Sequence, residues 1–528
     1  MDNASAPAQG RANRGSTGWR TLRWPWVGMA ALLVPAAVGM ACVALPERQA
    51  VQPVPAREVA ARTTLVGAQG PVAPSVKAGD LARLKAEGKG ALMQRQLAVL
   101  VAQGDQHLYR GNHARLLIDG PETFAAMKAA VAAARERVYV EFYIVEDGGV
   151  AAEMAELLVQ KAAAGVSVAL LYDSFGSMAT PKQFFDQLRA GGVQVCAFNP
   201  VNPLHEPGRW GLLQRNHRKM LAVDSEVAFI GGINLSNVYA EGSLGSAPGS
   251  ALRRPSARQP APAPASTSTS TSEGWRDTQV ELRGPVVPAM TALFRASWAA
   301  QRCTGNLPDA AATPATPATA ATAATAATAA TQAGQGTAQA ARAAPGQRIV
   351  KLVAGDPAQG VNPTYTILLA AIDAAQRSVS LTMAYFAPGP DFVQALADAA
   401  RRGVDVRLVL PGRSDVSLVL HAARSYYAQL MDAGVQVHEM QHAVMHAKTV
   451  VVDGVLSSVG SSNLDWRSIV GNSEIDVMVL GEDFGQQLDD QFRRDVDVSQ
   501  RIDPGVWQQR GLSRRLLERF GRLVQPLL

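Results

Sequence analysis

A short pattern that occurs twice in the chain constrains its fold more than any other feature. The first copy begins His-Arg-Lys at His217, and the second begins His-Ala-Lys at His446. In both copies an aspartate follows the lysine by five positions, an asparagine follows the aspartate by ten, and the run between lysine and aspartate is mostly apolar. Because four residue types recur at matched spacing, we expect two related halves.

Each copy is expected to project one imidazole and one ammonium group together, because residues two apart on a β-strand point to the same face. The motif residues are His217, Lys219, Asp224 and Asn234, then His446, Lys448, Asp453 and Asn463. If the two copies meet, these groups surround one pocket. A phosphodiester requires a nucleophile, a proton donor for the leaving oxygen and positive charge on its other oxygens, and this set supplies all three.

Further matched segments extend the repeat beyond the motifs. Each is a helical pattern that runs into an apolar strand, and four of them carry Gly-Val-x-Val. The matches are residues 134–144 with 375–386, 164–172 with 402–410, and 191–195 with 433–437. Alternation of this kind predicts sheets covered by helices.

The complete motif, His-x-Lys-x4-Asp followed by Gly-(Gly/Ser)-x-Asn, resembles the signature of the phospholipase D superfamily. Within it, the chain is most similar to the bacterial cardiolipin synthases, over roughly residues 108–242, 274–304 and 348–502. The resemblance implies an α/β fold. It consists of two pseudo-repeated phospholipase D-like α/β/α sandwich domains, packed with the active site at their interface.

The resemblance also implies a role for each motif residue. His217 would attack phosphorus to form a phosphohistidine and His446 would act as acid and base, an order that the spacing does not decide. Lys219, Lys448, Asn234, Asn463 and Ser461 would hold the phosphate oxygens. Asp224 and Asp453 complete the catalytic motifs, but they lie an odd number of positions from His and Lys. We therefore expect them to face away from the pocket and to be structural.

Two carboxylates are candidates for fixing the histidine tautomers. The resemblance puts a partner for His446 at Glu474, and Asp277 is the matching candidate for His217, displaced by an insertion. The alternative is that both are solvated strand carboxylates. Paired lysines would repel a cation, so we predict no metal site and no cofactor.

An apolar run of 22 uncharged residues, 24–45, follows four arginines and is long enough to span a bilayer. The arginine excess places the N-terminus in the cytoplasm and the rest outside. A cleaved signal peptide ending near Ala44, or a lipoprotein using Cys42, is the alternative.

The expected organisation follows from these features and from shifts in composition. It comprises a cytoplasmic N-terminus (1–23), a transmembrane helix (24–45), a linker and helix (46–107), a first phospholipase D-like domain (108–304) with a disordered insertion (243–272), a disordered Ala/Thr-rich linker (305–347), a second such domain (348–502) and a basic amphipathic helix (503–528). Residues 80–103 are expected to form one helix, and the C-terminal helix could pack on the body or contact anionic headgroups.

Three cysteines have no metal-ligand spacing, and Cys42 lies in the apolar segment, so at most Cys196 and Cys303 could pair. We predict no structural disulfide. The net charge of +6 is mild, and the arginines are scattered rather than gathered on a nucleic-acid face.

The function predicted is a phosphatidyltransferase in the bacterial inner membrane, single-pass, with its catalytic body on the periplasmic side. It would make cardiolipin from phosphatidylglycerol, with phosphatidylethanolamine as an alternative donor and no nucleic-acid partner. A hydrolase, either a phospholipase D or a nuclease, is the first alternative, and an inactive lipid-binding scaffold is the second.

Overall fold

The computed structural model describes Leu45, Arg48 and residues 56–86, 88–103, 107–201, 214–243, 274–305, 307–308 and 346–528. The predicted membrane span therefore lies outside the described residues except for Leu45, and so does most of the predicted insertion and of the Ala/Thr-rich linker. Among the described helices, none is long and apolar enough to cross a bilayer.

The first half contains a mixed sheet in which three parallel strands are followed by four antiparallel ones. Its spatial order is β6-β5-β4-β8-β9-β11-β3. The strands are β3 (His107–Ile118), β4 (Arg137–Phe142), β5 (Ser167–Asp173), β6 (Gln194–Phe198), β8 (Lys219–Val223), β9 (Val227–Gly231) and β11 (Thr278–Arg283). The repeat segments predicted to end in strands form β4, β5 and β6.

The second half repeats this order strand for strand, as β15-β14-β13-β17-β18-β19-β12. Its strands are β12 (Arg348–Gly355), β13 (Ser378–Met383), β14 (Asp405–Pro411), β15 (Gln436–Met440), β17 (Lys448–Val452), β18 (Leu456–Gly460) and β19 (Asn472–Leu480). The duplication expected from the two motifs is therefore present in the topology.

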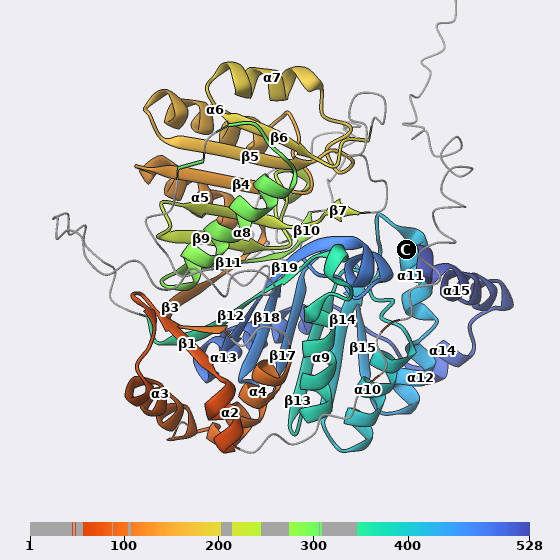
Figure 1. Ribbon diagram of the computed structural model, residues 1–528. Helices are drawn as coiled ribbons and strands as arrows, with labels where there is room; N and C mark the ends of the chain where they lie inside the picture. The colour runs from red at the N-terminus through yellow and green to blue at the C-terminus, as the bar shows by residue number, and fades with distance from the viewer. Residues whose placement is uncertain are drawn as a thin grey trace, which may run out of the picture. The chain divides into compact units, whose positions relative to one another are not determined.

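Strands of the two halves pair with one another at three places. The edge strands β3 and β12 are antiparallel, so the two sheets form one continuous sheet. The short strand β7 (Arg215–Asn216) pairs with the start of β19, and β10 (Trp275–Arg276) pairs with β16 (Val444–Met445). The last two contacts lie immediately before the motif histidines and bring the motifs together (Figure 1).

Helices lie on both faces of each half. In the first, α5 (Asp119–Ala133), α6 (Val150–Ala163) and α7 (Lys182–Ala190) share one apolar cluster, and α8 (Val286–Ala300) belongs to another. In the second, α9 (Pro363–Ala374), α10 (Pro390–Arg401) and α12 (Tyr427–Asp432) share one cluster with a residue of α11 (Ser417–Arg424). Helix α13 (Glu482–Asp497) packs against β13, β17, β18 and β19.

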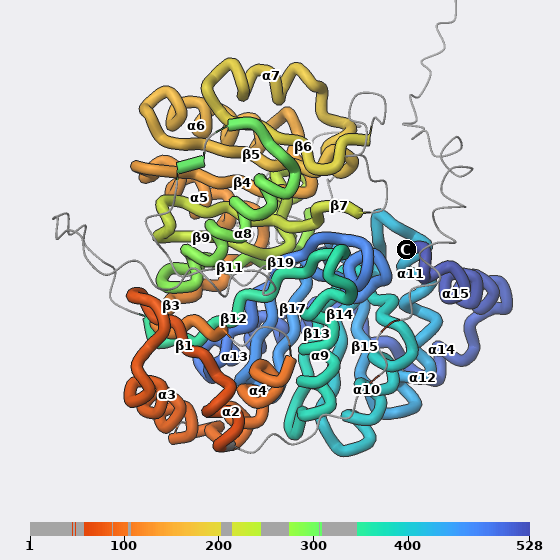
Figure 2. The backbone as a smooth tube through the Cα atoms, in the orientation of Figure 1, coloured from red at the N-terminus to blue at the C-terminus, as the bar shows by residue number. Residues whose placement is uncertain are grey.

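One apolar cluster is shared by the two halves. It contains Phe294 of α8 together with Val350 of β12, Val477 of β19 and Phe484 of α13, all fully buried. Because this cluster lies where the two sheets join, separating the halves would expose it to water. The traced backbone in Figure 2 shows α8 lying over the first-half strands close to this junction.

The N-terminal part differs from the single helix expected over residues 80–103. It contains α2 (Ala56–Arg62), β1 (Thr64–Gly67), β2 (Gly70–Pro71), α3 (Pro74–Ala86) and α4 (Gly90–Ala102). The break follows from Gly90, where a Cβ atom would overlap the carbonyl group of Lys85. The turn between α3 and α4 is thus too tight for a side chain at that position.

The C-terminal part also contains two helices rather than one. They are α14 (Pro504–Gln508) and α15 (Leu512–Val524), followed by a 3-10 turn, Gln525–Leu527. Helix α15 packs beside α11 at the edge of the second half (Figure 1).

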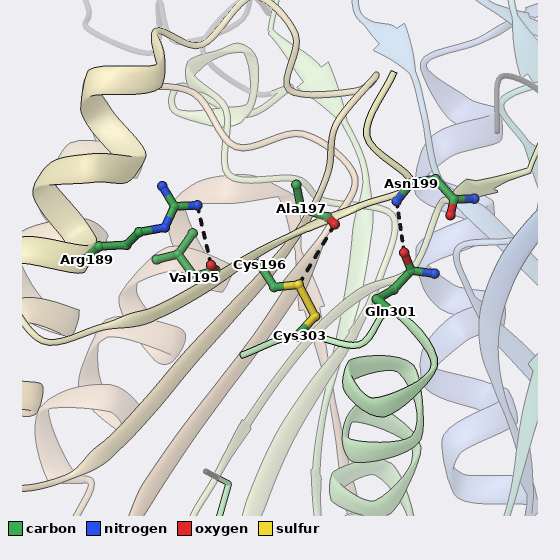
Figure 3. Close-up of a disulfide and its surroundings, with 7 residues drawn as sticks. All are labelled: Arg189, Val195, Cys196, Ala197, Asn199, Gln301 and Cys303. Carbon is green, nitrogen blue, oxygen red and sulfur yellow. Dashed lines mark hydrogen bonds between the residues drawn. A yellow bond between two sulfur atoms is a disulfide. The ribbon is translucent and has the colours of Figure 1, made fainter. Parts of the chain in front are cut away.

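The prediction of no structural disulfide was wrong. Cys196 of β6 and Cys303, just after α8, are bonded, with Cα atoms 5.7 Å apart and a sequence separation of 107 (Figure 3). The end of α8 returns to the edge strand β6, where the backbone N–H of Asn199 donates to Gln301 Oε1 at 3.0 Å. Sequence spacing alone did not show that these two ends meet.

Candidate active site

The motif residues lie where the strands of one half meet those of the other. His217 lies between β7 and β8, and His446 lies between β16 and β17. Both residues are buried, with exposed fractions of 8% and 5%. The lysines open strands β8 and β17, and their side chains return to the histidines: Lys219 Nζ donates to His217 O at 2.6 Å, and Lys448 Nζ lies 3.0 Å from His446 Nδ1.

The carboxylate partners are crossed between the halves, which reverses the predicted pairing. His217 Nδ1 lies 3.0 Å from the carboxylate oxygens of Glu474, and His446 Nδ1 lies 2.7 Å from Asp277 Oδ2. We expected Glu474 to accompany His446 and Asp277 to accompany His217. Each half instead supplies the carboxylate for the histidine of the other.

Strand register explains the crossing. In the β7–β19 pair, Asn216 is opposite Ser473, and in the β10–β16 pair, Arg276 is opposite Met445. The next position along each pair sets a histidine beside a carboxylate. The backbone N–H of His217 donates to Ser473 O at 2.9 Å, and that of His446 donates to Arg276 O at 2.8 Å. Sequence separation could not reveal this, because it carries no information on which half a strand joins.

The two lysines hold their protons weakly. Burial is the main cause and lowers the pKa of Lys219 to about 7 and that of Lys448 to about 8, against opposing attraction from carboxylates that include Glu474 and Asp277. The ring of Tyr143 lies 5.3 Å from Lys219 Nζ, a cation–π distance. A phosphodiester anion in the pocket would favour the charged form of both ammonium groups.

The two histidines differ electrostatically despite their matching motifs. Burial, followed by the charge of Lys219, lowers the pKa of His217 well below its usual value. Burial and Lys448 also lower the pKa of His446, but Asp277 opposes the shift through its charge and its hydrogen bond. Burial raises the pKa of Glu474 to about 7, so the carboxyl group behind His217 is only partly ionised near neutral pH. The environment thus favours neutral His217 more strongly than neutral His446.

Asp224 and Asp453 directly follow the motif strands β8 and β17. Each has a positive φ and begins the turn to the next strand. Asp224 accepts the backbone N–H groups of Arg135, Glu136 and Arg137 at 2.8 Å. Asp453 accepts the corresponding groups of residues 376–378. These contacts tie the motif strand to the start of its neighbour, β4 or β13, and do not involve the histidines.

The predicted phosphate-binding residues occupy different environments. Asn234 Oδ1 accepts the backbone N–H of Ile144 at 3.1 Å. Asn463 Oδ1 is buried and has no hydrogen-bond partner among the residues that the structure describes. Ser461 donates its hydroxyl to Glu474 Oε2 at 2.6 Å, so it supports the carboxylate behind His217. The partnerless atom of Asn463 is a hydrogen-bond acceptor, so it would be satisfied by a donor such as a hydroxyl group.

An aromatic wall surrounds the histidines and was not anticipated from the sequence. Trp275 lies 5.0 Å and Tyr385 lies 6.1 Å from the His446 ring, and Tyr239 Oη is 3.2 Å from its Nδ1. Tyr143 lies 5.1 Å from the His217 ring. Tyr143 directly follows β4 and Tyr385 lies two residues after β13, the strands that pair with the motif strands, and an aromatic residue near the end of both strands was a readable signal.

Arg218, the residue between His217 and Lys219, was also overlooked. Its guanidinium is buried and donates to Ser297 Oγ at 2.7 Å in the first half, and to Gly355 O at 3.0 Å and Glu474 O at 3.2 Å in the second. It therefore joins the two halves beside the motif histidine His217. The equivalent position in the second motif is Ala447, so the repeat gave no signal for it.

No group of His, Cys, Asp and Glu side chains in the described part of the chain is arranged to hold a metal ion. The arrangement instead offers two imidazoles, each backed by a carboxyl group, and two ammonium groups at the junction of the two halves. Such a set can carry out covalent transfer at phosphorus without a metal.

Comparisons with known proteins agree with this chemistry. Residues 127–243 and 368–496 match the family described as cardiolipin synthase, PLD-like domain. The cardiolipin synthase of Geobacillus thermodenitrificans is 31% identical over 82% of this chain and 76% of its own length. Cardiolipin synthase A of Pseudomonas aeruginosa is 33% identical over 79% of this chain and 74% of its own length.

Among solved structures, phosphatidylserine synthase from Haemophilus influenzae superposes with a TM-score of 0.55 at 12% identity, covering 79% of this chain and 95% of that one. This likeness concerns the fold. The duplicated topology, the crossed histidine–carboxyl pairs and the sequence relatives agree, and the chain belongs to the cardiolipin synthase family of the phospholipase D superfamily.

Proposed function

We propose that this protein transfers a phosphatidyl group from one phospholipid to the headgroup hydroxyl of phosphatidylglycerol. The products are cardiolipin and glycerol, or ethanolamine when phosphatidylethanolamine is the donor. The observation that carries the proposal is the pair of His–Lys sites, each completed by a carboxyl group from the other half, in a chain whose relatives are named cardiolipin synthases.

The reaction proceeds in two displacements at phosphorus. His217 Nε2 attacks, because Nδ1 is bonded to Glu474, and a P–N bond forms as the P–O bond to the headgroup breaks. His446 gives its proton to the departing alkoxide. His446 then takes the proton of the acceptor hydroxyl, whose oxygen attacks phosphorus and releases His217. The pKa difference between the two histidines supports this order, since the nucleophile must be neutral and the acid protonated.

Lys219 and Lys448 bind the non-bridging oxygens and stabilise the charge that develops on them. Asn463 donates its amide NH2 to the same oxygens, as the superfamily resemblance implies. Asn234 and Ser461 complete the phosphate site as the superfamily resemblance implies, the latter through its hydrogen bond to Glu474.

The domain plan and location form part of the same proposal. Two phospholipase D-like α/β/α domains, 108–304 and 348–502, meet at the pocket, and a span over residues 24–45 anchors them to the inner membrane. The Cys196–Cys303 disulfide supports a periplasmic catalytic body, because such bonds persist in oxidising compartments and are rare in the cytosol.

The test is turnover by the purified full chain in detergent with labelled phosphatidylglycerol. Cardiolipin and glycerol in equal amounts support the proposal. Phosphatidic acid as the main product would instead indicate a hydrolase, and absence of turnover would indicate a scaffold. His217→Ala and His446→Ala should each reduce product formation by several orders of magnitude.

A further inference from the structure

Helix α15 exposes its apolar side and buries its polar side. Leu512, Leu516 and Phe520 are four residues apart and therefore share one face, and Leu523 and Leu517 flank them. Their exposed fractions are 71%, 54%, 54%, 77% and 49%. The residues of α15 that are buried against the body are Glu518 and Gly521. This is the reverse of the arrangement expected for a helix that packs on a core.

Specific polar contacts fix this orientation. Glu518 accepts two hydrogen bonds from Arg510 Nε at 2.9 Å and one from its Nη2 at 2.8 Å. Gln525, directly after the helix, accepts the hydroxyl hydrogen of Tyr426 at 2.6 Å. At Gly521 the helix approaches α11 so closely that a Cβ atom would press on the backbone of Ala422. Turning the apolar face inward would break these contacts. It would also place a large side chain where α15 and α11 approach most closely.

The exposed apolar face is bordered by positive charge. Arg515, Arg519 and Arg522 are all exposed, and the guanidinium of Arg522 lies 4.6 Å from the ring of Tyr426. A helix with leucine and phenylalanine on one side and arginines beside them matches an interface that is apolar inside and anionic at its surface. A second protein could bind this face only through a patch that is both apolar and anionic, whereas an anionic bilayer has this combination over its whole surface.

The helix is connected to the catalytic pocket through short contacts. The backbone N–H of Arg467 donates to Leu528 O at 3.0 Å, and the charge of Arg467 contributes to the lowered pKa of His217. On the other side of α15, α11 begins after Asp415, which accepts the hydroxyl hydrogen of Tyr385 at 2.8 Å. Tyr385 in turn lies against His446.

We propose that α15 is an interfacial helix that lies on the surface of an anionic bilayer, with Leu512, Leu516, Phe520 and Leu523 below the headgroups and the arginines among them. It would hold the catalytic pocket at the surface from which lipid substrates enter. The inference rests on the proposed function in one respect, since a phosphatidyltransferase has to meet its substrates in a bilayer.

The test uses the full chain in lipid nanodiscs, with an environment-sensitive nitrobenzoxadiazole dye on a single thiol. Cys42→Ser removes the third cysteine of the sequence, and Phe520→Cys provides the labelling site. His217→Ala removes turnover, and the anionic lipid is phosphatidylserine, so the readout is independent of catalysis. The matched control carries the dye at Gln486→Cys, an exposed position on α13.

On discs that contain phosphatidylserine, the dye at 520 should shift to shorter wavelength and be quenched by lipids carrying a nitroxide near the headgroup. The dye at 486 should do neither. Replacing Arg515 and Arg519 by glutamine should weaken binding of α15 to the bilayer surface roughly fivefold for each charge removed. The weaker binding is measured as a loss of quenching of the dye at 520.

Three results would overturn the proposal: no quenching at 520, equal quenching on discs of phosphatidylcholine alone, or a spectral shift that depends on protein concentration rather than on lipid, which would indicate a second copy of the chain. Quenching at 520 in the labelled variant, combined with failure of the unsubstituted full chain to make cardiolipin, would overturn the proposed function and support the interfacial helix.

Discussion

Asparagine in place of Asp277 should impair proton transfer by His446 and spare the nucleophile, His217. Asp277 Oδ2 accepts from His446 Nδ1 at 2.7 Å, while its Oδ1 accepts the backbone N–H of Thr278 at 2.7 Å. In Asp277→Asn, the remaining oxygen stays with Thr278 and the amide NH2 faces Nδ1. The ring is then held as a neutral tautomer, which is a much weaker acid than the imidazolium.

The size of the loss follows from the role assigned to His446. General acid catalysis contributes about 10² to 10⁴ in rate. The lost contact is a buried, charge-assisted hydrogen bond, which is among the stronger ones in proteins. We therefore expect Asp277→Asn to reduce the transfer rate with phosphatidylglycerol by about 10³, within the range given by general acid catalysis.

A donor with a p-nitrophenol headgroup separates the two halves of the site, because this leaving group departs without a proton. In Asp277→Asn, the pre-steady-state burst of p-nitrophenol should return to within about tenfold of the wild-type rate, since the acid is no longer required. Glu474→Gln disturbs His217 and should remain slow with both donors. Asp186→Asn, an exposed position on α7, serves as the matched substitution and should leave both rates unchanged.

The crossed assignment makes this experiment decisive. If p-nitrophenol rescues Glu474→Gln and leaves Asp277→Asn slow, the roles of the two histidines are exchanged. If neither variant is rescued, the carboxyl groups act through the fold rather than through proton transfer, and the reasoning above is refuted.

Three further predictions follow from the same contacts. Gly232→Ala should reduce activity about as much as Asp277→Asn does, because a Cβ atom at Gly232 would overlap the Asp277 carboxylate. The measurement is the transfer rate, with thermal unfolding as a check that the variant folds, and a wild-type rate would contradict the prediction. Cys303→Ser should lower the free energy of unfolding by up to about 5 kcal/mol, which is the chain-entropy estimate for a loop of this length. Denaturant titration against the oxidised wild type measures the difference, and equal stability would show that the disulfide does not stabilise the folded state. Burial raises the pKa of Asp465 from 3.8 to about 7, so the folded state keeps a proton that the unfolded state loses, and stability should fall as pH rises through that window. Burial raises the pKa of Glu474 to about 7 and that of Asp476 to about 6, so Asp465→Asn should reduce this dependence without abolishing it; the same change in unfolding free energy with pH in both proteins would refute the prediction.

The repeat made much of the fold predictable. The apolar segments that Gly-Val-x-Val opens became β5, β6, β14 and β15, because a short apolar run after a helical pattern has few other structures available. The break between α3 and α4 was missed, since leucine spacing continues across it and Gly90 is a weak signal on its own. The break between α14 and α15 was missed as well.

Long-range pairing accounts for the rest of what sequence could not supply. Glu474 and Asp277 were identified as candidates from residue type and position, but their partners depend on which half β7 and β10 join. The same reason hid the Cys196–Cys303 bond and the bridging role of Arg218. Each of these depends on two segments more than 75 residues apart meeting in space.

The exchange of carboxyl groups between the halves makes the two motifs mutually dependent. Either half expressed alone would carry a histidine with no acidic neighbour and a strand, β7 or β16, with nothing to pair with. Two fragments cut within residues 309–345 should each be inert and regain turnover when mixed. The duplicated halves do not carry two complete active sites, because each half supplies only part of a single shared site.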